Sequence, residues 1–191
     1  QIQFKKVIRS AIKGNLSIGQ TIDCVFIEGF NFLSNADYTH FIRVDRREGK
    51  LEITTSETET KYIHKVYADG SFAGKTRQSG YGGFIEDPDG NRKIFSEFFY
   101  DGSNNLMELL AVTEGLQRLK TANKIQVNTD SRFVIRGLVQ WVHFWKLNNW
   151  QTAYGSDVKF AKSWQKTEQL CEGKFIEFRW IKGHSGNKKQ D

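Results

Sequence analysis

Three acidic residues lie among apolar residues or glycines, where charged side chains are uncommon unless they have a structural or functional role. Asp69 lies in Tyr-Ala-Asp-Gly-Ser, Glu108 in Asn-Asn-Leu-Met-Glu-Leu-Leu and Asp130 in Asn-Thr-Asp-Ser. Taken singly, each has an ordinary explanation, because aspartates often end strands or cap turns and glutamates favour the positive end of a helix. Brought to one point, several carboxylates would repel one another strongly unless divalent cations neutralised them. The set therefore predicts a site for a hard cation, Mg²⁺ by preference and Mn²⁺ as a substitute.

The chemistry of such a site would be phosphodiester hydrolysis. Two cations about 3.5–4 Å apart can activate an attacking water and stabilise the departing oxygen. A net charge of +6 suits a polyanionic partner. Most of this charge lies after residue 62, where the sequence has 19 basic and 14 acidic residues; residues 1–62 have 9 basic and 8 acidic residues. No run approaches the roughly 20 apolar residues that cross a bilayer. Cys24 and Cys171 fit no disulfide framework, which favours a reducing compartment such as the cytoplasm.

The elements that must position these carboxylates follow a regular order from Ile63 onward. Alternating and helical hydrophobic patterns predict the order βββαβααβ and hence an α/β fold, a mixed five-stranded sheet flanked by helices. The predicted strands are Ile63–Asp69, Tyr81–Glu86, Ile94–Tyr100, Lys124–Thr129 and Phe175–Ile181; the predicted helices are Leu106–Lys120, a segment from Ser131 through Trp145, and Asp157–Cys171. Asp69 and Asp130 each end a strand in this scheme, so parallel neighbours would bring both to one edge of the sheet.

Residues 1–62 are predicted to form a separate small β-rich accessory domain, with residues 63–191 as the catalytic domain. Its β-like runs are Thr21–Ile27, Tyr38–Val44 and Leu51–Thr55. The polar run Glu57–Lys61 is either a linker or a surface strand. The only methionine is Met107, so Gln1 is not expected to be the natural start, and the chain is expected to come from a larger or processed polypeptide.

Five motifs in order across residues 63–191 resemble type 1 ribonuclease H. They are Asp-Gly-Ser at 69–71, Asn-Asn-x-Met-Glu-Leu at 104–109, Thr-Asp-Ser at 129–131, Gln-Trp-Val-His-x-Trp at 140–145 and Lys-Gly-His-Ser-Gly at 182–186. The resemblance implies a ribonuclease H-like fold. It also implies an endonuclease that hydrolyses the RNA strand of RNA·DNA hybrids with two metal ions, leaving a 5′-phosphate and a 3′-hydroxyl.

The resemblance also implies roles for individual residues. Asp69, Glu108, Asp130 and Asp191 match the four metal-binding carboxylates, and His184 matches a mobile histidine that assists proton transfer or product departure. Residues near the first carboxylates would sense the RNA 2′-hydroxyl; these are Gly70, Ser71, Asn104, Asn105 and Ser131. Trp141 and Trp145 would line the channel for the DNA strand, although two tryptophans four residues apart are equally typical of helix core packing.

Two departures from the family change these expectations. The segment Lys146–Gln151 carries one lysine where many members have a strongly basic protrusion, so hybrid binding there should be weaker. Basic residues of the accessory domain could compensate; they are Lys5, Lys6, Arg9, Arg43, Arg46 and Arg47. The stretch from His184 to Asp191 is short and the customary final helix is missing, although Asn187-x-x-x-Asp191 still matches the family pattern.

Two other functions stay open at this point. A noncatalytic module on the same fold would bind hybrid without turning it over. An integrase- or resolvase-like nuclease would use the same carboxylates on DNA, because fold alone does not decide the substrate. Cleavage of a hybrid but not of duplex DNA would separate the second from a ribonuclease.

Overall fold

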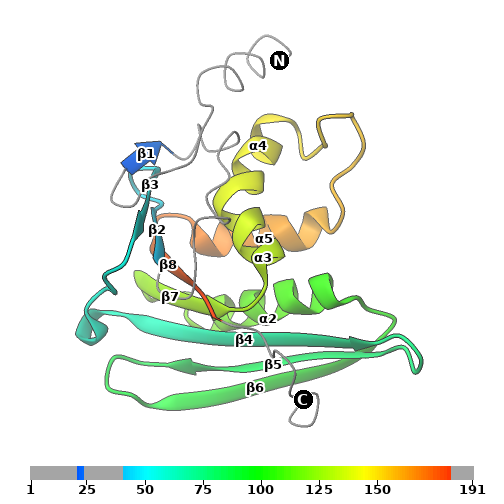
Figure 1. The fold of residues 1–191 in the computed structure, drawn as a ribbon, viewed down its shortest axis with the longest axis horizontal. Coiled ribbons are helices and arrows are strands. Elements are labelled where there is room, and N and C mark those ends of the chain that lie inside the picture. Colours follow the sequence, from blue (N-terminus) through cyan, green and yellow to red (C-terminus); the bar gives the residue numbers. More distant parts are fainter. Residues whose placement is uncertain (1–20, 24–40, 182–191) are drawn as a thin grey trace.

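The computed structural model describes residues 21–23 and 41–181 of the 191-residue chain, and its strands form one mixed sheet (Figure 1). The sheet has eight strands in the order β1-β3-β2-β8-β7-β4-β5-β6. Their bounds are β1 Thr21–Asp23, β2 Phe41–Asp45, β3 Lys50–Thr54, β4 His64–Ala73, β5 Gln78–Glu86, β6 Arg92–Tyr100, β7 Lys124–Thr129 and β8 Phe175–Trp180. The predicted fold class, an α/β ribonuclease H-like fold with a mixed sheet, is confirmed.

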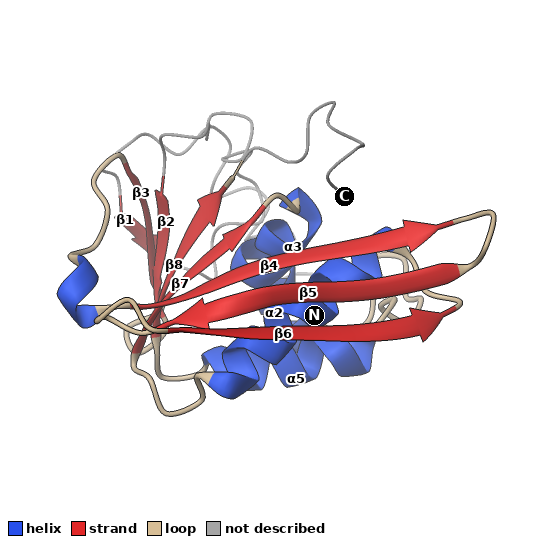
Figure 2. Ribbon diagram, turned by 90° about the horizontal axis from the view of Figure 1, so that it is seen from below, coloured by secondary structure: helices blue, strands red, loops and turns tan. Residues whose placement is uncertain are grey.

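The helices complete the predicted βββαβααβ order. They are α2 Asn104–Arg118, α3 Arg132–Arg136, the π-helix η4 Gly137–Trp141, α4 Val142–Leu147 and α5 Ala161–Cys171, with a short 3₁₀ turn η3 at Thr60–Tyr62. Helices α2, α3 and α5 lie on the same side of the sheet (Figure 2). Among the described residues, no helix is long and apolar enough to cross a membrane.

The core lies between this face of the sheet and the helices. Val66 and Ala68 of β4 are buried, and Gly115 of α2 lies so close to Val66 that a Cβ there would collide with its side chain. Since side chains alternate along a strand, residues 65, 67 and 69 of β4 must point to the opposite face. On the helix side, Trp164 of α5 is fully buried, and burial of such a large side chain contributes on the order of 2–3 kcal/mol.

The two strands that bear Asp69 and Asp130 are parallel neighbours, which is the arrangement that the sequence analysis required to bring the two carboxylates together. Strands β4 and β7 pair in parallel from His64↔Ile125 to Tyr67↔Asn128. Asp130 follows β7 directly, but Asp69 does not end its strand. Strand β4 continues to Ala73, because the Gly-Ser sequence after Asp69 pairs with β5 instead of turning. Asp69 therefore stands mid-strand, beside the point where β7 ends.

The sheet is wider than the five strands that the sequence predicted. Strand β2 pairs antiparallel with β8, from Phe41↔Arg179 to Asp45↔Phe175, so β1–β3 extend the sheet of the catalytic segment. Pairing between residues 130 to 138 positions apart leaves no local signal in the sequence. The run after Glu57 is a connection that ends in η3, not a strand. The division of the chain into two domains at residue 62 stays a prediction, but the sheet runs through it.

Candidate active site

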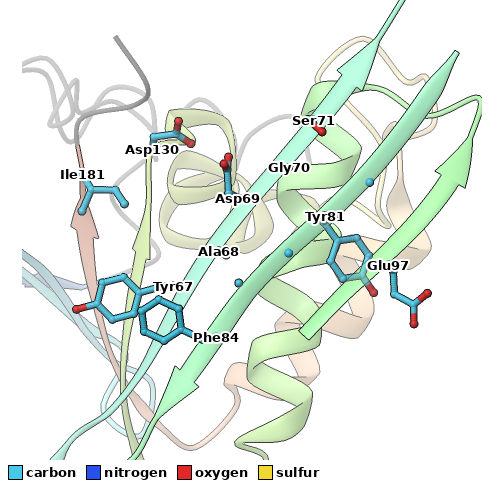
Figure 3. Close-up of a pocket in the computed structure, with 13 residues that line it drawn as sticks. Tyr67, Ala68, Asp69, Gly70, Ser71, Tyr81, Phe84, Glu97, Asp130 and Ile181 are labelled. Carbon is cyan, nitrogen blue, oxygen red and sulfur yellow. The ribbon is translucent and has the colours of Figure 1, made fainter. Parts of the chain in front are cut away.

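Asp69, Glu108 and Asp130 come together where β7 ends, beside the middle of β4. Each offers a carboxylate oxygen, and these oxygens all lie within 4.8 Å of one another. Figure 3 shows Asp69 on β4 and Asp130 at the end of β7 with their carboxylates toward each other. The three residues reach this point from a strand interior, a strand end and the second turn of α2. The predicted cluster is therefore a geometric fact, while its role as a metal site is a proposal.

Helix α2 can bring Glu108 this close because β4 has a glycine at its contact point. A Cβ on Gly70 would stand 2.5 Å from the backbone nitrogen of Glu108, a separation that real Cβ atoms do not show. Ser103 caps the helix, since its hydroxyl accepts a hydrogen bond from the Leu106 N–H at 3.1 Å. The cap fixes where the helix begins, and the glycine allows it to pack closely on β4. Together they set the position of Glu108 relative to Asp69.

The electrostatics of the cluster disfavour its fully ionised form. Burial and, after it, the nearby charges of Asp130 and Asp69 together raise the pKa of Glu108 to about 9, although a hydrogen bond from the Gly70 N–H lowers it. Only 9% of Glu108 is exposed, and its Oε2 is buried with no hydrogen-bond partner. An orphaned carboxylate oxygen beside two further carboxylates fits a hard divalent cation as its missing partner.

Asp130 is held by its neighbours on both sides. The Ser131 N–H donates to Thr129 Oγ1 at 3.1 Å, and the Ser131 hydroxyl caps α3 by accepting from the Val134 N–H at 3.2 Å. From β8, the Trp180 Nε1–H donates to the backbone oxygen of Asp130 at 3.1 Å. These bonds anchor the backbone on which the carboxylate stands.

A cleft of about 470 Å³ opens over the three carboxylates. All five residues predicted to sense the 2′-hydroxyl line it, namely Gly70, Ser71, Asn104, Asn105 and Ser131. A second cleft, of about 560 Å³, shares Asp69, Gly70, Ser71 and Asp130 and continues over β5 (Figure 3). The structure therefore places the predicted polar residues around the acidic cluster.

The first cleft also contains residues that the sequence reasoning missed, among them Phe72, Arg132 and Phe133. The guanidinium of Arg132 lies 3.7 Å from the ring centroid of Trp180, a close cation–π contact. Arg132 is exposed, and no ion pair with another described residue accompanies it. Its only sequence signal is a position two residues after Asp130; the stacking depends on β8.

Trp141 and Trp145 belong to an aromatic cluster beside this cleft. Their ring centroids lie 5.8 Å apart, and Trp145 packs on the buried Trp164 at 5.5 Å. Trp141 in turn packs on Phe133, which lines the cleft, at 5.7 Å. Both tryptophans are only partly buried, so core packing and an exposed aromatic face occur together. Their contact with a DNA strand stays a prediction.

His184 and Asp191 lie outside the described residues, as do Lys5, Lys6 and Arg9. The three described arginines of the N-terminal segment each form an ion pair with a carboxylate of this chain, which contradicts their role as a free basic surface. Arg43 pairs with Glu177 and Glu52, Arg46 with Glu168, and Arg47 with Asp45. Lys146 is the one lysine of the segment where many family members have a basic protrusion, and its Nζ lies 3.3 Å from Glu168 Oε1.

Comparison with known proteins agrees with this geometry. A sequence profile described as RNase H matches residues 61–191. Ribonuclease H of Idiomarina loihiensis is 36% identical over 134 residues, 70% of this chain and 84% of that protein, and that of Photorhabdus luminescens is 37% identical over 127 residues, 66% and 81%. A foamy viral protease-reverse transcriptase solved with an RNA/DNA hybrid shares the fold, with a TM-score of 0.55 at 14% identity over 71% of this chain and 20% of that one. The chain belongs to the ribonuclease H family.

Proposed function

We propose that this protein is an endoribonuclease that hydrolyses the RNA strand of RNA·DNA hybrids at the Asp69–Glu108–Asp130 cluster. The observation that supports this most directly is the convergence of three carboxylates within 4.8 Å at the floor of a cleft lined by asparagine, serine and glycine. Membership of the ribonuclease H family supports the same reaction.

Asp69, Glu108 and Asp130 would hold the divalent cations, with Asp191 as a fourth ligand carried over from the family pattern. Oxygen ligands favour Mg²⁺, with Mn²⁺ as a substitute. The chemistry that such ions supply when bound is activation of a water nucleophile and stabilisation of the leaving oxygen. The reaction would leave a 5′-phosphate and a 3′-hydroxyl, and His184 would assist proton transfer or product departure.

Discrimination between RNA and DNA would come from the polar rim of the cleft. Ser71, Asn104 and Asn105 are exposed beside the carboxylates and can exchange hydrogen bonds with a ribose 2′-hydroxyl, which DNA lacks. Gly70 and Ser131 add backbone groups at the same place. Trp141 and Trp145 would support the DNA strand by stacking against sugars or bases.

The test is cleavage of an end-labelled RNA·DNA hybrid in Mg²⁺, beside single-stranded RNA and duplex DNA. We expect cleavage of the hybrid alone, abolished by EDTA and by Asp130→Asn. Asp157→Asn, in the exposed loop before α5, is the matched control and should cut as the unaltered chain does. Tight hybrid binding without cleavage would instead favour the noncatalytic module, and cleavage of duplex DNA would favour the DNA nuclease.

A further inference from the structure

A row of polar side chains crosses five strands of the sheet on the face opposite α2. The strand registers align Lys65↔Gln126, Gln126↔Glu177, Glu177↔Arg43 and Arg43↔Glu52, so that β4, β7, β8, β2 and β3 each contribute one residue. Gln126 and Glu177 are fully buried. Buried charge is costly unless it is paired, so a carboxylate in the middle of a sheet calls for an explanation.

Glu177 is satisfied mainly by the N-terminal segment. Its Oε1 accepts hydrogen bonds from Arg43 Nε at 2.9 Å, from Thr58 Oγ1 at 2.9 Å and from the Thr58 N–H at 3.1 Å. Its Oε2 accepts from Gln126 Nε2 at 2.8 Å. Three of these four bonds come from residues before position 62. The carboxylate therefore joins the N-terminal strands to β7.

From Gln126 the hydrogen bonds continue one step along β7, to Asn128, which lies two residues before Asp130. The Asn128 Nδ2 donates to Gln126 Oε1 at 3.0 Å, and residues 126, 128 and 130 point to the same face because side chains alternate. The end of β8 also contacts this part of β7. The Ile181 N–H donates to the backbone oxygen of Thr129 at 3.0 Å, and the Trp180 Nε1–H donates to the backbone oxygen of Asp130. Glu177 thus lies on β8 and accepts a hydrogen bond from Gln126 of β7, and these are the two strands that fix Asp130.

We propose that Glu177 is a positioning residue for the acidic cluster, and that Arg43 and Thr58 hold Glu177 in place by their hydrogen bonds to it. The N-terminal segment is then needed for the geometry of the site. The inference rests on the proposed function for its catalytic consequence, but its structural content is the placement of Asp130. A supporting partner of a metal ligand that is removed typically changes metal affinity or activity about 10–100-fold.

The experiment compares Arg43→Ala with Arg47→Ala. Both remove an arginine of the same segment, but Arg47 is exposed, and among the described residues its ion pair is with Asp45 at the surface. Mn²⁺ affinity, measured by titration calorimetry without substrate, should weaken about tenfold in Arg43→Ala and stay unchanged in Arg47→Ala. With hybrid and Mg²⁺, Arg43→Ala should lower kcat and raise the Mg²⁺ concentration for half-maximal rate, while KM for the hybrid stays within about twofold.

Two further variants keep the inference falsifiable if Arg43→Ala folds poorly. Thr58→Val removes one hydroxyl donor and should shift Mn²⁺ affinity in the same direction by a smaller factor. Arg43→Ala with Glu177→Gln removes the orphaned charge and should recover stability relative to Arg43→Ala alone. Unchanged Mn²⁺ affinity in both Arg43→Ala and Thr58→Val, measured well below their melting temperatures, overturns the positioning role. Failure of the unaltered chain to cut hybrid would overturn the proposed function and leave the metal-binding comparison intact.

Discussion

At the scale of single residues, Glu108 is a buried acidic group whose ionised form lowers the stability of the fold. Its carboxyl is buried beside two other carboxylates, and burial with those charges raises its pKa to about 9. A carboxyl with a folded pKa above its unfolded value stabilises the fold below the unfolded pKa. That contribution is lost as the pH rises toward the folded pKa. Without a cation, the free energy of unfolding should therefore fall between about pH 4.5 and pH 9.

Glu108→Gln should remove this pH dependence. At pH 8 without metal, the variant should unfold at a higher temperature than the unaltered chain, because the slope it abolishes is at most about 1.4 kcal/mol per pH unit. Mg²⁺ should raise the melting temperature of the unaltered chain and have little effect on the variant. Thermal unfolding between pH 5 and pH 9, with Glu114→Gln of the same helix as control, measures both. Parallel pH profiles for Glu108→Gln and the unaltered chain would refute this account.

Arg132 is a second residue whose environment implies a role. A guanidinium stacked on an aromatic ring keeps its hydrogen-bond donors free in a fixed plane, and this one lies in the cleft beside Asp130. Arg132→Ala should raise KM for hybrid with little change in kcat, and should reduce the slope of log affinity against log salt by about one if the contact is a phosphate. Arg136→Ala, in the next helical turn, is the control. Equal KM values for Arg132→Ala and the control would exclude a substrate contact.

At the scale of elements, the sequence predicted the helices and strands whose formation depends on residues close together in the chain. Lys124–Thr129 forms β7 as predicted, since a run of alternating apolar residues bounded by turns has few alternatives. Helix α2 spans Asn104–Arg118, close to the predicted Leu106–Lys120, because its apolar residues recur at helical spacing. The extension of β4 past Asp69 was missed because Gly-Ser also begins turns, and only pairing with β5 decides. The β2–β8 pairing and the stacking of Arg132 on Trp180 join residues far apart in sequence, so no local pattern could reveal them.

The π-helix η4 is the element least visible in the sequence. It begins at Gly137, where a Cβ would overlap the ring of Trp164, so the extra residue in the helical turn coincides with a close helix–helix contact. Gly137→Ala should destabilise the protein by about 1–3 kcal/mol in urea unfolding, as overpacking does. Gly74→Ala, whose Cβ would meet only Phe72 at 4.0 Å, should change stability by less than about 0.5 kcal/mol. Comparable losses in both variants would mean that the contact with Trp164 is not the cause.

At the scale of the whole molecule, the N-terminal strands and the catalytic segment share one sheet. Removing residues 1–62 would turn β8 into an edge strand and would strip Glu177 of Arg43 and Thr58. The shortened chain should therefore lose several kcal/mol of stability, because Glu177 loses three hydrogen bonds to its charged oxygen, each worth about 1.5–3 kcal/mol. Chemical unfolding would measure the loss, and Glu177→Gln in the shortened chain should recover part of it. Unfolding of the shortened chain at the same denaturant concentration as the full chain would show that the strands are dispensable.

The polar row across the sheet also bears on how the chain selects one fold during folding. If β2 slid by two residues along β8, Glu177 would face Phe41 or Asp45 instead of Arg43. The first misalignment would leave a buried carboxylate against a ring, and the second would set two like charges opposite each other. Apolar strands that slide by two residues keep the same face buried, so hydrophobic pattern alone cannot prevent this error. A charged pair at the centre of the sheet rejects it, and the same residues that stabilise the native alignment thereby exclude its nearest competitors.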